Sequence, residues 1–384
     1  MLSRVVLILG LCGCEQILGI SEPTDFQDAR GVGSIDSPLF VCATIPAWGA
    51  GANFSAPGSR GLAVGDLDHD GIRDIVVASQ SDVLIFNGTG VGGLGAVHPL
   101  RSSVATPADD ILIADLDGDG FNDLVTWTVS GVTIHRQSTI MPGTFLAPQS
   151  FTTNPIGVTP AASHAVRAGK LDGNGLVDLV VATMTGARIY TARMASPGDY
   201  DIGSTIGPPG SSVEFVGDVD GDGLDDIIIG GDQIKIAFNT PGAPGTFGAP
   251  AAVGGPGNFV GATVGAFSNN APRKDLVTFS GPSVVLFTQP SSRTFIETMT
   301  VPGFSTGARP VTFDLNGDGH DDLASAEEFV LQCPQPGQFA MTESFLRLPA
   351  GSSTAAQVFE DINANGKPDL LRVSNSPFLE VFLQ

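Results

Sequence analysis

Four aspartates near the middle of the chain are spaced so that they could share one metal ion. Residues 218–229 read DVDGDGLDDIII, which places Asp218, Asp220, Asp222 and Asp226 at positions 1, 3, 5 and 9 of a short loop. Two carboxylates about 4 Å apart repel each other by roughly 4 kcal/mol at an effective dielectric constant near 20, so four around one point need a cation. Glycine at position 6 permits the left-handed backbone that brings the four side chains together.

All of the side chains in this group offer oxygen atoms. Hard oxygen ligands in a flexible loop suit Ca²⁺, which takes about 6 to 8 of them, better than Mg²⁺ or a soft transition metal. Position 7 would add a backbone carbonyl oxygen. An EF-hand is excluded because it needs flanking helices and a glutamate at position 12, whereas position 12 here is Ile229 in an apolar run. The loop therefore leads directly into a β-strand.

Copies of this loop recur at intervals of 47 to 55 residues, beginning at residues 66, 115, 170, 218, 266, 314 and 361, and they are numbered here loops one to seven. Loops one, two and four carry four aspartates, whereas loop six has one asparagine among its ligands and loop seven has two. The predicted Ca²⁺ ligands are Asp66, Asp68, Asp70, Asp74, Asp115, Asp117, Asp119, Asp123, Asp218, Asp220, Asp222, Asp226, Asp314, Asn316, Asp318, Asp322, Asp361, Asn363, Asn365 and Asp369.

Loops three and five depart from the acidic pattern. In loop three Lys170 stands at position 1, where its ammonium group could neutralise Asp172 and Asp178 in place of an ion. Loop five is one residue longer, begins at Ala266 and contains the basic pair at residues 273–274. We therefore expect five bound Ca²⁺ ions, with the ion in loop seven held most weakly.

Each loop precedes two short apolar runs that predict β-strands. Examples of these runs lie at residues 75–78, 83–86, 179–182, 227–229, 234–238 and 284–287. Four short strands in each unit of nearly 50 residues form one blade of a β-propeller. Continuous apolar strands fit blades that neighbouring blades cover on both faces. The sequence thus predicts an all-β, seven-bladed β-propeller over residues 51–384.

The chain resembles the FG-GAP repeats, also called VCBS-type repeats, of integrin alpha-chain propellers and many secreted bacterial proteins. Residues 247–250 spell Phe-Gly-Ala-Pro, and weaker versions of the motif stand at 145–148 and 54–57. The resemblance implies a propeller with Ca²⁺ bound in the acidic loops. The seventh unit ends after its third strand at residues 378–383, so we expect the N-terminal segment at 53–57 to supply the fourth strand and close the ring.

The first 13 residues have the pattern of a signal peptide, with Arg4 followed by an apolar run too short to span a bilayer. Residues 11–14 read Leu-Cys-Gly-Cys and resemble a bacterial lipobox, which makes Cys14 the expected lipid-modified residue; an ordinary signal peptide that contains cysteines is the alternative. Residues 14–50 are rich in Gly, Ser, Asp and Pro and are expected to form a tether. These features predict a lipoprotein of the bacterial cell envelope, anchored to the outer membrane on its periplasmic or surface side.

Composition limits the partners of the chain. A net charge of −22 argues against nucleic acid as a ligand, because its phosphates would be repelled. Much of the acidity lies in the metal loops rather than in a partner-binding patch. Cys42 and Cys333 remain in the exported part, where they either form a disulfide or stay separate thiols.

No arrangement typical of catalysis is visible in the sequence. Residues 88–93 have the glycine spacing of a dinucleotide-binding turn, but residues 94–99 cannot open the helix that such a site needs. The five histidines lack metal-ligand spacing and are expected at the solvated surface. There is no nucleophile-elbow serine and no Cys/His pair of hydrolytic type.

Two functions remain open from the sequence. The first is a monomeric binding or adhesion module for a protein or glycan ligand, without enzymatic activity; the alternative is a polysaccharide-modifying, lyase-like enzyme that uses a propeller face. Sugar sites often present Trp or Tyr rings, and only two of each are present, which disfavours a multivalent lectin. We expect the ligand on the face opposite the acidic loops, at residues 101–110, 153–164, 205–212 and 302–310.

Overall fold

The computed structural model of this chain describes residues 46–384 apart from residues 80, 91–93, 101–107, 129, 152–164, 255–258, 281–282, 303–309, 326–327, 333–345, 348–353 and 375–376. The expected signal peptide, the lipid site at Cys14 and most of the expected tether lie outside the described residues, as do Cys42 and Cys333. Three of the four segments expected to bind ligand, at 101–110, 153–164 and 302–310, also lie largely or wholly outside them.

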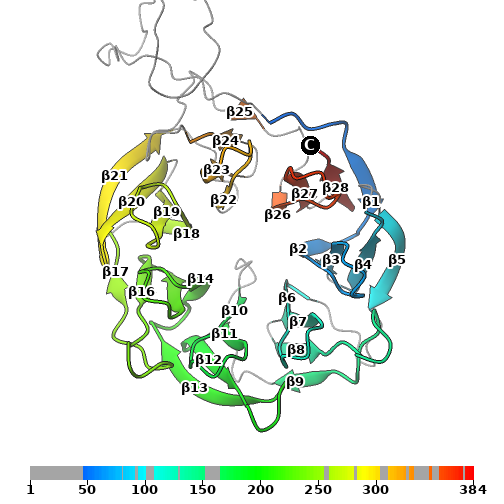
Figure 1. The fold of residues 1–384 in the computed structure, drawn as a ribbon, viewed down its shortest axis with the longest axis horizontal. Coiled ribbons are helices and arrows are strands. Elements are labelled where there is room, and N and C mark those ends of the chain that lie inside the picture. The colour runs from blue at the N-terminus through cyan, green and yellow to red at the C-terminus, as the bar shows by residue number, and fades with distance from the viewer. Residues whose placement is uncertain are drawn as a thin grey trace, which may run out of the picture.

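Seven antiparallel sheets of four strands form a ring in the described part of the chain (Figure 1). The strands of each blade are given from the centre outwards. Blade one contains β2 (Ser59–Gly65), β3 (Asp74–Ser79), β4 (Val83–Gly88) and β5 (Leu94–Leu100); blade two β6 (Asp110–Ala114), β7 (Asp123–Thr128), β8 (Gly131–His135) and β9 (Gln149–Phe151); blade three β10 (Val166–Gly169), β11 (Asp178–Thr183), β12 (Gly186–Ala192) and β13 (Tyr200–Ile206); and blade four β14 (Ser212–Gly217), β15 (Asp226–Gly230), β16 (Lys235–Ala237) and β17 (Ala251–Ala252). Blade five contains β18 (Phe259–Gly265), β19 (Asp275–Ser280), β20 (Ser283–Ser291) and β21 (Thr294–Pro302); blade six β22 (Val311–Phe313), β23 (Asp322–Ala324), β24 (Glu328–Val330) and β25 (Leu346–Arg347); and blade seven β26 (Thr354–Glu360), β27 (Asp369–Ser374), β28 (Phe378–Phe382) and β1 (Ala52–Ser55).

This arrangement confirms the prediction of an all-β, seven-bladed propeller. No helix occurs in the residues that the structure describes, and none of them could form a helical membrane span. Residues 94–100, where a dinucleotide-binding turn would need a helix, form strand β5, and no helix opens there, as predicted.

The acidic loops join the first and second strands of the blades, and every second strand begins at the aspartate in position 9, which in the longer loop five is the tenth residue. After their first aspartate these second strands are mostly apolar and buried, because both of their faces are covered. In β3 and β11, for example, every residue is buried. Side chains from adjacent blades share one core, as where Ile75 and Phe86 of blade one pack with Leu371 and Val381 of blade seven.

The ends of the propeller meet in blade seven, where β1 pairs with β28 in antiparallel register from Ala52 opposite Val381 to Ser55 opposite Phe378. Figure 1 shows this N-terminal strand on the outer edge of the blade formed by the C-terminal strands. The pairing extends beyond β1, because the Gly49 amide donates to the Leu383 carbonyl at 2.7 Å. Just before it, the Trp48 ring packs edge-on against Phe329 of blade six, with 5.5 Å between ring centroids.

Candidate metal centre

In three loops the structure brings carboxylates together closely enough to share an ion. The ligand oxygens within each group lie within 4.8 Å of one another. The groups are Asp66, Asp68 and Asp70 in loop one, Asp115, Asp117 and Asp123 in loop two, and Asp218, Asp220 and Asp226 in loop four. The strongest acidic patterns in the sequence therefore fold as converging carboxylates.

Two positions in each regular loop have a left-handed backbone. Position 6 holds the expected glycine, such as Gly71 with φ of 82°. Position 4 is also left-handed, which the sequence analysis did not anticipate, and it holds His69 in loop one and Ala364 in loop seven with φ of 61° and 57°. Left-handed residues at 4 and 6 curl the chain so that backbone amides point inward at the aspartate of position 1. In loop one, for instance, the Gly71 amide donates to Oδ2 of Asp66 at 2.9 Å.

The aspartate at position 9 has the same surroundings in all seven loops. One of its oxygens accepts a hydrogen bond from the backbone N–H at position 2, and the other accepts one from a backbone N–H near the end of the third strand. In loop one these donors are Leu67 at 2.7 Å and Gly88 at 2.9 Å. The seven residues are Asp74, Asp123, Asp178, Asp226, Asp275, Asp322 and Asp369, all at most 1% exposed. Each of these carboxylates ties three segments of its blade together whether or not the loop keeps its other acidic residues.

Burial makes a charge on these carboxylates costly in the absence of a cation. It raises the pKa of Asp74 to about 6, of Asp226 to about 7 and of Asp322 to about 8, although the two backbone hydrogen bonds lower each pKa. Neighbouring aspartates in the same loop raise these pKa values further by repulsion. A bound divalent cation would reverse this balance and favour the ionised form.

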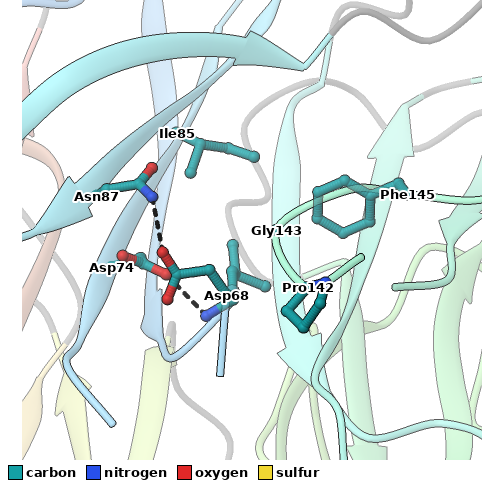
Figure 2. A pocket seen from close by; sticks show the side chains of 8 residues that line it. Asp68, Asp74, Ile85, Asn87, Pro142, Gly143 and Phe145 are labelled. Atoms are coloured by element: carbon teal, nitrogen blue, oxygen red, sulfur yellow. Dashed lines mark hydrogen bonds between the residues drawn. The ribbon is translucent and has the colours of Figure 1, made fainter. Parts of the chain in front are cut away.

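The residues of loop one fit a cation. Oδ1 of Asp66 is buried and accepts no hydrogen bond, so this oxygen lacks the partner that a metal ion would provide. The Asn87 amide donates to Oδ2 of Asp68 at 2.9 Å and holds that side chain beside Asp74 (Figure 2). An all-oxygen set of this kind is what a hard cation such as Ca²⁺ prefers.

A cavity of about 250 Å³ lies beside loop one, between blades one and two. Figure 2 shows Asp68, Asp74, Asn87 and Ile85 on one side of it and the turn at residues 142–145 on the other. This turn belongs to the hairpin between β8 and β9, so the next blade covers the loop.

Comparison with known proteins identifies the repeat. Residues 66–126 and 115–181 match the family model described as FG-GAP-like repeat, and together they span loops one to three. The chain is an FG-GAP repeat propeller. No curated protein matches the sequence.

Solved structures agree with this fold. The chain is similar to an Agrocybe aegerita lectin, described as specifically recognising non-reducing terminal N-acetylglucosamine, with 18% identity, a TM-score of 0.56 and coverage of 85% of this chain and 86% of the lectin. It is also similar to BBS1N, solved in complex with ARL6DN, with 15% identity, a TM-score of 0.58 and coverage of 88% and 98%. At these identities the likeness shows a shared fold alone.

Loop three of this FG-GAP propeller differs from the prediction made for it. The Lys170 ammonium makes no ion pair with Asp172 or Asp178. Instead, the Asn174 amide donates to Oδ2 of Asp172 at 2.9 Å and to the Ala192 carbonyl at 2.8 Å. Lys170 itself is exposed, and the Asn174 amide takes the place expected for its ammonium group beside Asp172.

Loop five closes through neutral groups. The Ser268 hydroxyl donates to Oδ1 of Asp275 at 3.0 Å, and the Asn270 amide donates to Ser268 at 2.7 Å. These bonds occupy the region where aspartates stand in the regular loops.

In loops six and seven the asparagines act as hydrogen-bond donors. The Asn316 amide donates to Oδ2 of Asp318 at 3.1 Å, and the Asn363 amide donates to Oδ1 of Asp369 at 3.3 Å. Asn365 reaches the Gln384 carbonyl at the end of the described chain. An ion in these loops would need the amides to turn their oxygens inward.

A link between blades was missed by the sequence analysis. In blades four, five and seven, the residue near the end of the third strand whose N–H bonds the loop aspartate also sends an amide side chain to the loop of the preceding blade. Asn239 donates to the Leu171 carbonyl at 2.7 Å, and Gln384 donates to the Leu315 carbonyl at 3.1 Å. A recurring Asn or Gln at this point of the repeat is the signal that could have revealed it.

One histidine prediction is wrong. His135, at the end of β8, is only 2% exposed and not part of a solvated surface. Burial among apolar groups lowers its pKa to about 4, which keeps the ring neutral, and the Phe145 ring packs edge-on against it. His69 is exposed, as predicted. Its ring also packs against the Phe121 ring of loop two, with 4.4 Å between ring centroids.

Proposed function

We propose that this chain is a calcium-braced binding module without enzymatic activity. The observation that carries the proposal is the closure of the acidic loops: their carboxylates accept backbone hydrogen bonds within the loop, and the next blade's hairpin covers loop one. A group that is bonded and covered in this way braces the fold and has no open position for a substrate. The ligand surface is then a different part of the propeller.

Ca²⁺ would be held by the aspartates at positions 1, 3, 5 and 9 of loops one, two and four, and by the mixed aspartate and asparagine sets of loops six and seven. Its chemistry there is a cross-link that neutralises repelling carboxylates. The chain's own residues supply the rest, because the left-handed backbone and the inward amides hold the carboxylates in place.

The ligand face is proposed to lie opposite the acidic loops. Strand β14 ends at loop four, so the connection between β13 and β14, at residues 207–211, lies at the other end of the blade. This connection lies within the segment 205–212, the one of the four expected ligand segments that the structure describes.

Burial of the aromatic residues supports a protein ligand over a sugar. Trp127 is fully buried, and Tyr190 and Tyr200 are 5% and 8% exposed. Trp48 packs against Phe329 and Phe359. The rings that commonly stack on sugars are thus packed inside this propeller. The lectin with a similar fold supports a glycan as the second candidate ligand.

We also propose that the chain is exported to the bacterial cell envelope and anchored by a lipid on Cys14, as a monomer. Replacing Cys14 with Ser should abolish incorporation of labelled fatty acid and release the protein from membranes. Unchanged membrane association of C14S would contradict the anchor without affecting the binding role.

A direct test presents the calcium-loaded chain to a glycan array, to native envelope proteins and to acidic polysaccharides monitored for cleavage. We expect a bound ligand and no turnover. Neutral replacement of the four segments opposite the acidic loops should abolish binding, with the melting temperature as the control for folding. Cleavage of a polysaccharide would contradict the proposal, as would full affinity after all four replacements.

A further inference from the structure

Loop four differs from the other four-aspartate loops because a cation of the chain itself already occupies it. Arg293, in the turn between β20 and β21 of blade five, reaches across to the loop of blade four. Its Nη2 donates to Oδ2 of Asp222 at 3.0 Å, and its Nε donates to Oδ2 of Asp220. The Asp220 side chain is 1% exposed, so this ion pair is shielded on one side from water.

Arg293 binds the carboxylate oxygens of Asp220 and Asp222 that accept no hydrogen bond from the loop backbone. Oδ1 of Asp220 accepts from the Asp222 amide at 3.1 Å, and Oδ1 of Asp222 accepts from the Leu224 amide at 2.9 Å. The second oxygen of each aspartate is therefore the one available to an ion, and both contact the guanidinium. In the described part of loops one and two, no arginine forms an ion pair with Asp68, Asp70, Asp117 or Asp119.

The position of Arg293 in its hairpin is occupied by glycine in other blades. The hairpins that cover loops one and three read Gly143-Thr144-Phe145 and Gly245-Thr246-Phe247, and the hairpin over loop four reads Arg293-Thr294-Phe295. All three first residues have a left-handed backbone, with φ of 80°, 85° and 62°. This conformation is unfavourable for a residue with a side chain, so arginine is held there against its preference.

The glycines also show that this turn lies directly over the loop. A Cβ atom on Gly143 would lie 3.1 Å from Cβ of Asp68, and one on Gly245 would lie 3.1 Å from Cβ of Asp172, both at position 3. A side chain at this point of the hairpin is aimed at the metal ligands of the preceding blade. The guanidinium is held further by the Asn239 carbonyl at 3.0 Å and by the Phe238 ring, whose centroid lies 4.9 Å from Cζ.

We propose that Arg293 is a built-in competitor of Ca²⁺ that sets the affinity of loop four. Because one positive charge is already tethered among four carboxylates, the loop presents the same net charge as the three-carboxylate loop six. Loop four then binds Ca²⁺ more weakly than loops one and two, despite the same aspartate pattern. In the absence of calcium, Arg293 keeps blades four and five joined. The inference rests on calcium binding in the proposed function.

The test is a Ca²⁺ titration of the full chain by calorimetry with chelator competition, comparing the native chain with Arg293→Gln. We expect one site to gain affinity by about tenfold, which corresponds to about 1.4 kcal/mol. The melting temperature in EDTA should fall, because the ion pair is lost, while the increase in melting temperature on adding Ca²⁺ should become larger.

Two comparisons assign the effect to loop four. The gain should disappear when Asp220 and Asp222 are both replaced by Asn, and it should not occur in Arg193→Gln, which removes an equally charged partner from the exposed pair with Asp201. Arg293→Gly, which restores the residue found in the other hairpins, serves if the glutamine variant fails to fold. Unchanged or weaker binding in both Arg293 variants would overturn the role of Arg293 alone, whereas a native chain that binds no Ca²⁺ would overturn the calcium-braced function as well.

Discussion

The buried aspartate at position 9 can stabilise the propeller in two ways, through backbone hydrogen bonds and as a metal ligand. Its backbone hydrogen bonds are present in all seven loops, including loops three and five, which lack the full acidic set. In loop five Asp275 accepts from the Phe267 amide at 3.0 Å and the Gln289 amide at 2.8 Å. Bracing by this carboxylate is therefore independent of any metal.

Asp275→Ala should destabilise the propeller by about 3 kcal/mol, because buried donors left without partners cost roughly 1 to 3 kcal/mol each. Chemical denaturation in EDTA and in millimolar Ca²⁺ should give the same loss. The matched variant Asp123→Ala, in loop two, should lose more in Ca²⁺ than in EDTA. A calcium-dependent loss in Asp275→Ala would show that loop five holds an ion.

At this scale the sequence predicted the acidic clusters but not their local partners. Asp66, Asp68 and Asp70 converge because the spacing of aspartates and glycines within a short loop is enough to determine how that loop folds. Arg293 lies 73 residues after Asp220 in the chain. Its role depends on which hairpin lies over which loop, and no spacing rule within one repeat contains that information.

Among the elements, the hairpins and the amide side chains join one blade to the next. Asn239 is fully buried after β16, donates to the Leu171 and Asp225 carbonyls, and accepts from the Thr240 and Gly245 amides. Gln289 has the corresponding place near the end of β20, but its contacts to the Val219 and Lys274 carbonyls are longer, at 3.3 Å, and its Oε1 has no partner. Asn239 and Gln289 thus make the same contact between blades, with shorter hydrogen bonds in Asn239 and longer ones in Gln289.

Asn239→Ala should cost about 3 kcal/mol of stability, since four hydrogen bonds of a buried side chain are lost. Gln289→Ala should cost clearly less. Urea denaturation of both variants, with Ca²⁺ present throughout, measures the difference. An equal or larger loss for Gln289→Ala would mean that these amides do not hold the blades together.

The strands themselves were predictable because their signals are local. Apolar runs such as residues 75–78 and 179–182 form the buried second strands, and the loops before them mark where each strand begins. The contacts between blades were not predictable, since they join residues about 50 positions apart whose side chains carry no pattern until the ring exists.

For the whole molecule, closure joins two ends more than 300 residues apart. The pairing of β1 with β28 covers an edge that would otherwise be open to other chains. The Phe54 ring also packs against Phe86 of blade one, with 6.1 Å between centroids, so the same segment contacts the blade on its other side.

Deleting residues 50–58 should lower the melting temperature of the entire ring and promote association, instead of fraying one end. The experiment uses the soluble chain without its lipid, and monitors melting by circular dichroism and size by light scattering. A deletion chain that melts at the parent's temperature and stays monomeric would contradict this account of closure.

Calcium bracing is the central claim, and the melting temperature in EDTA against millimolar Ca²⁺ tests it most directly. A ligand that binds only the folded state stabilises it by mass action, so calcium should raise the melting temperature strongly. Calorimetric titration of the same sample should give five ions, with loop seven filling last. Identical melting temperatures in EDTA and in Ca²⁺ would contradict the claim.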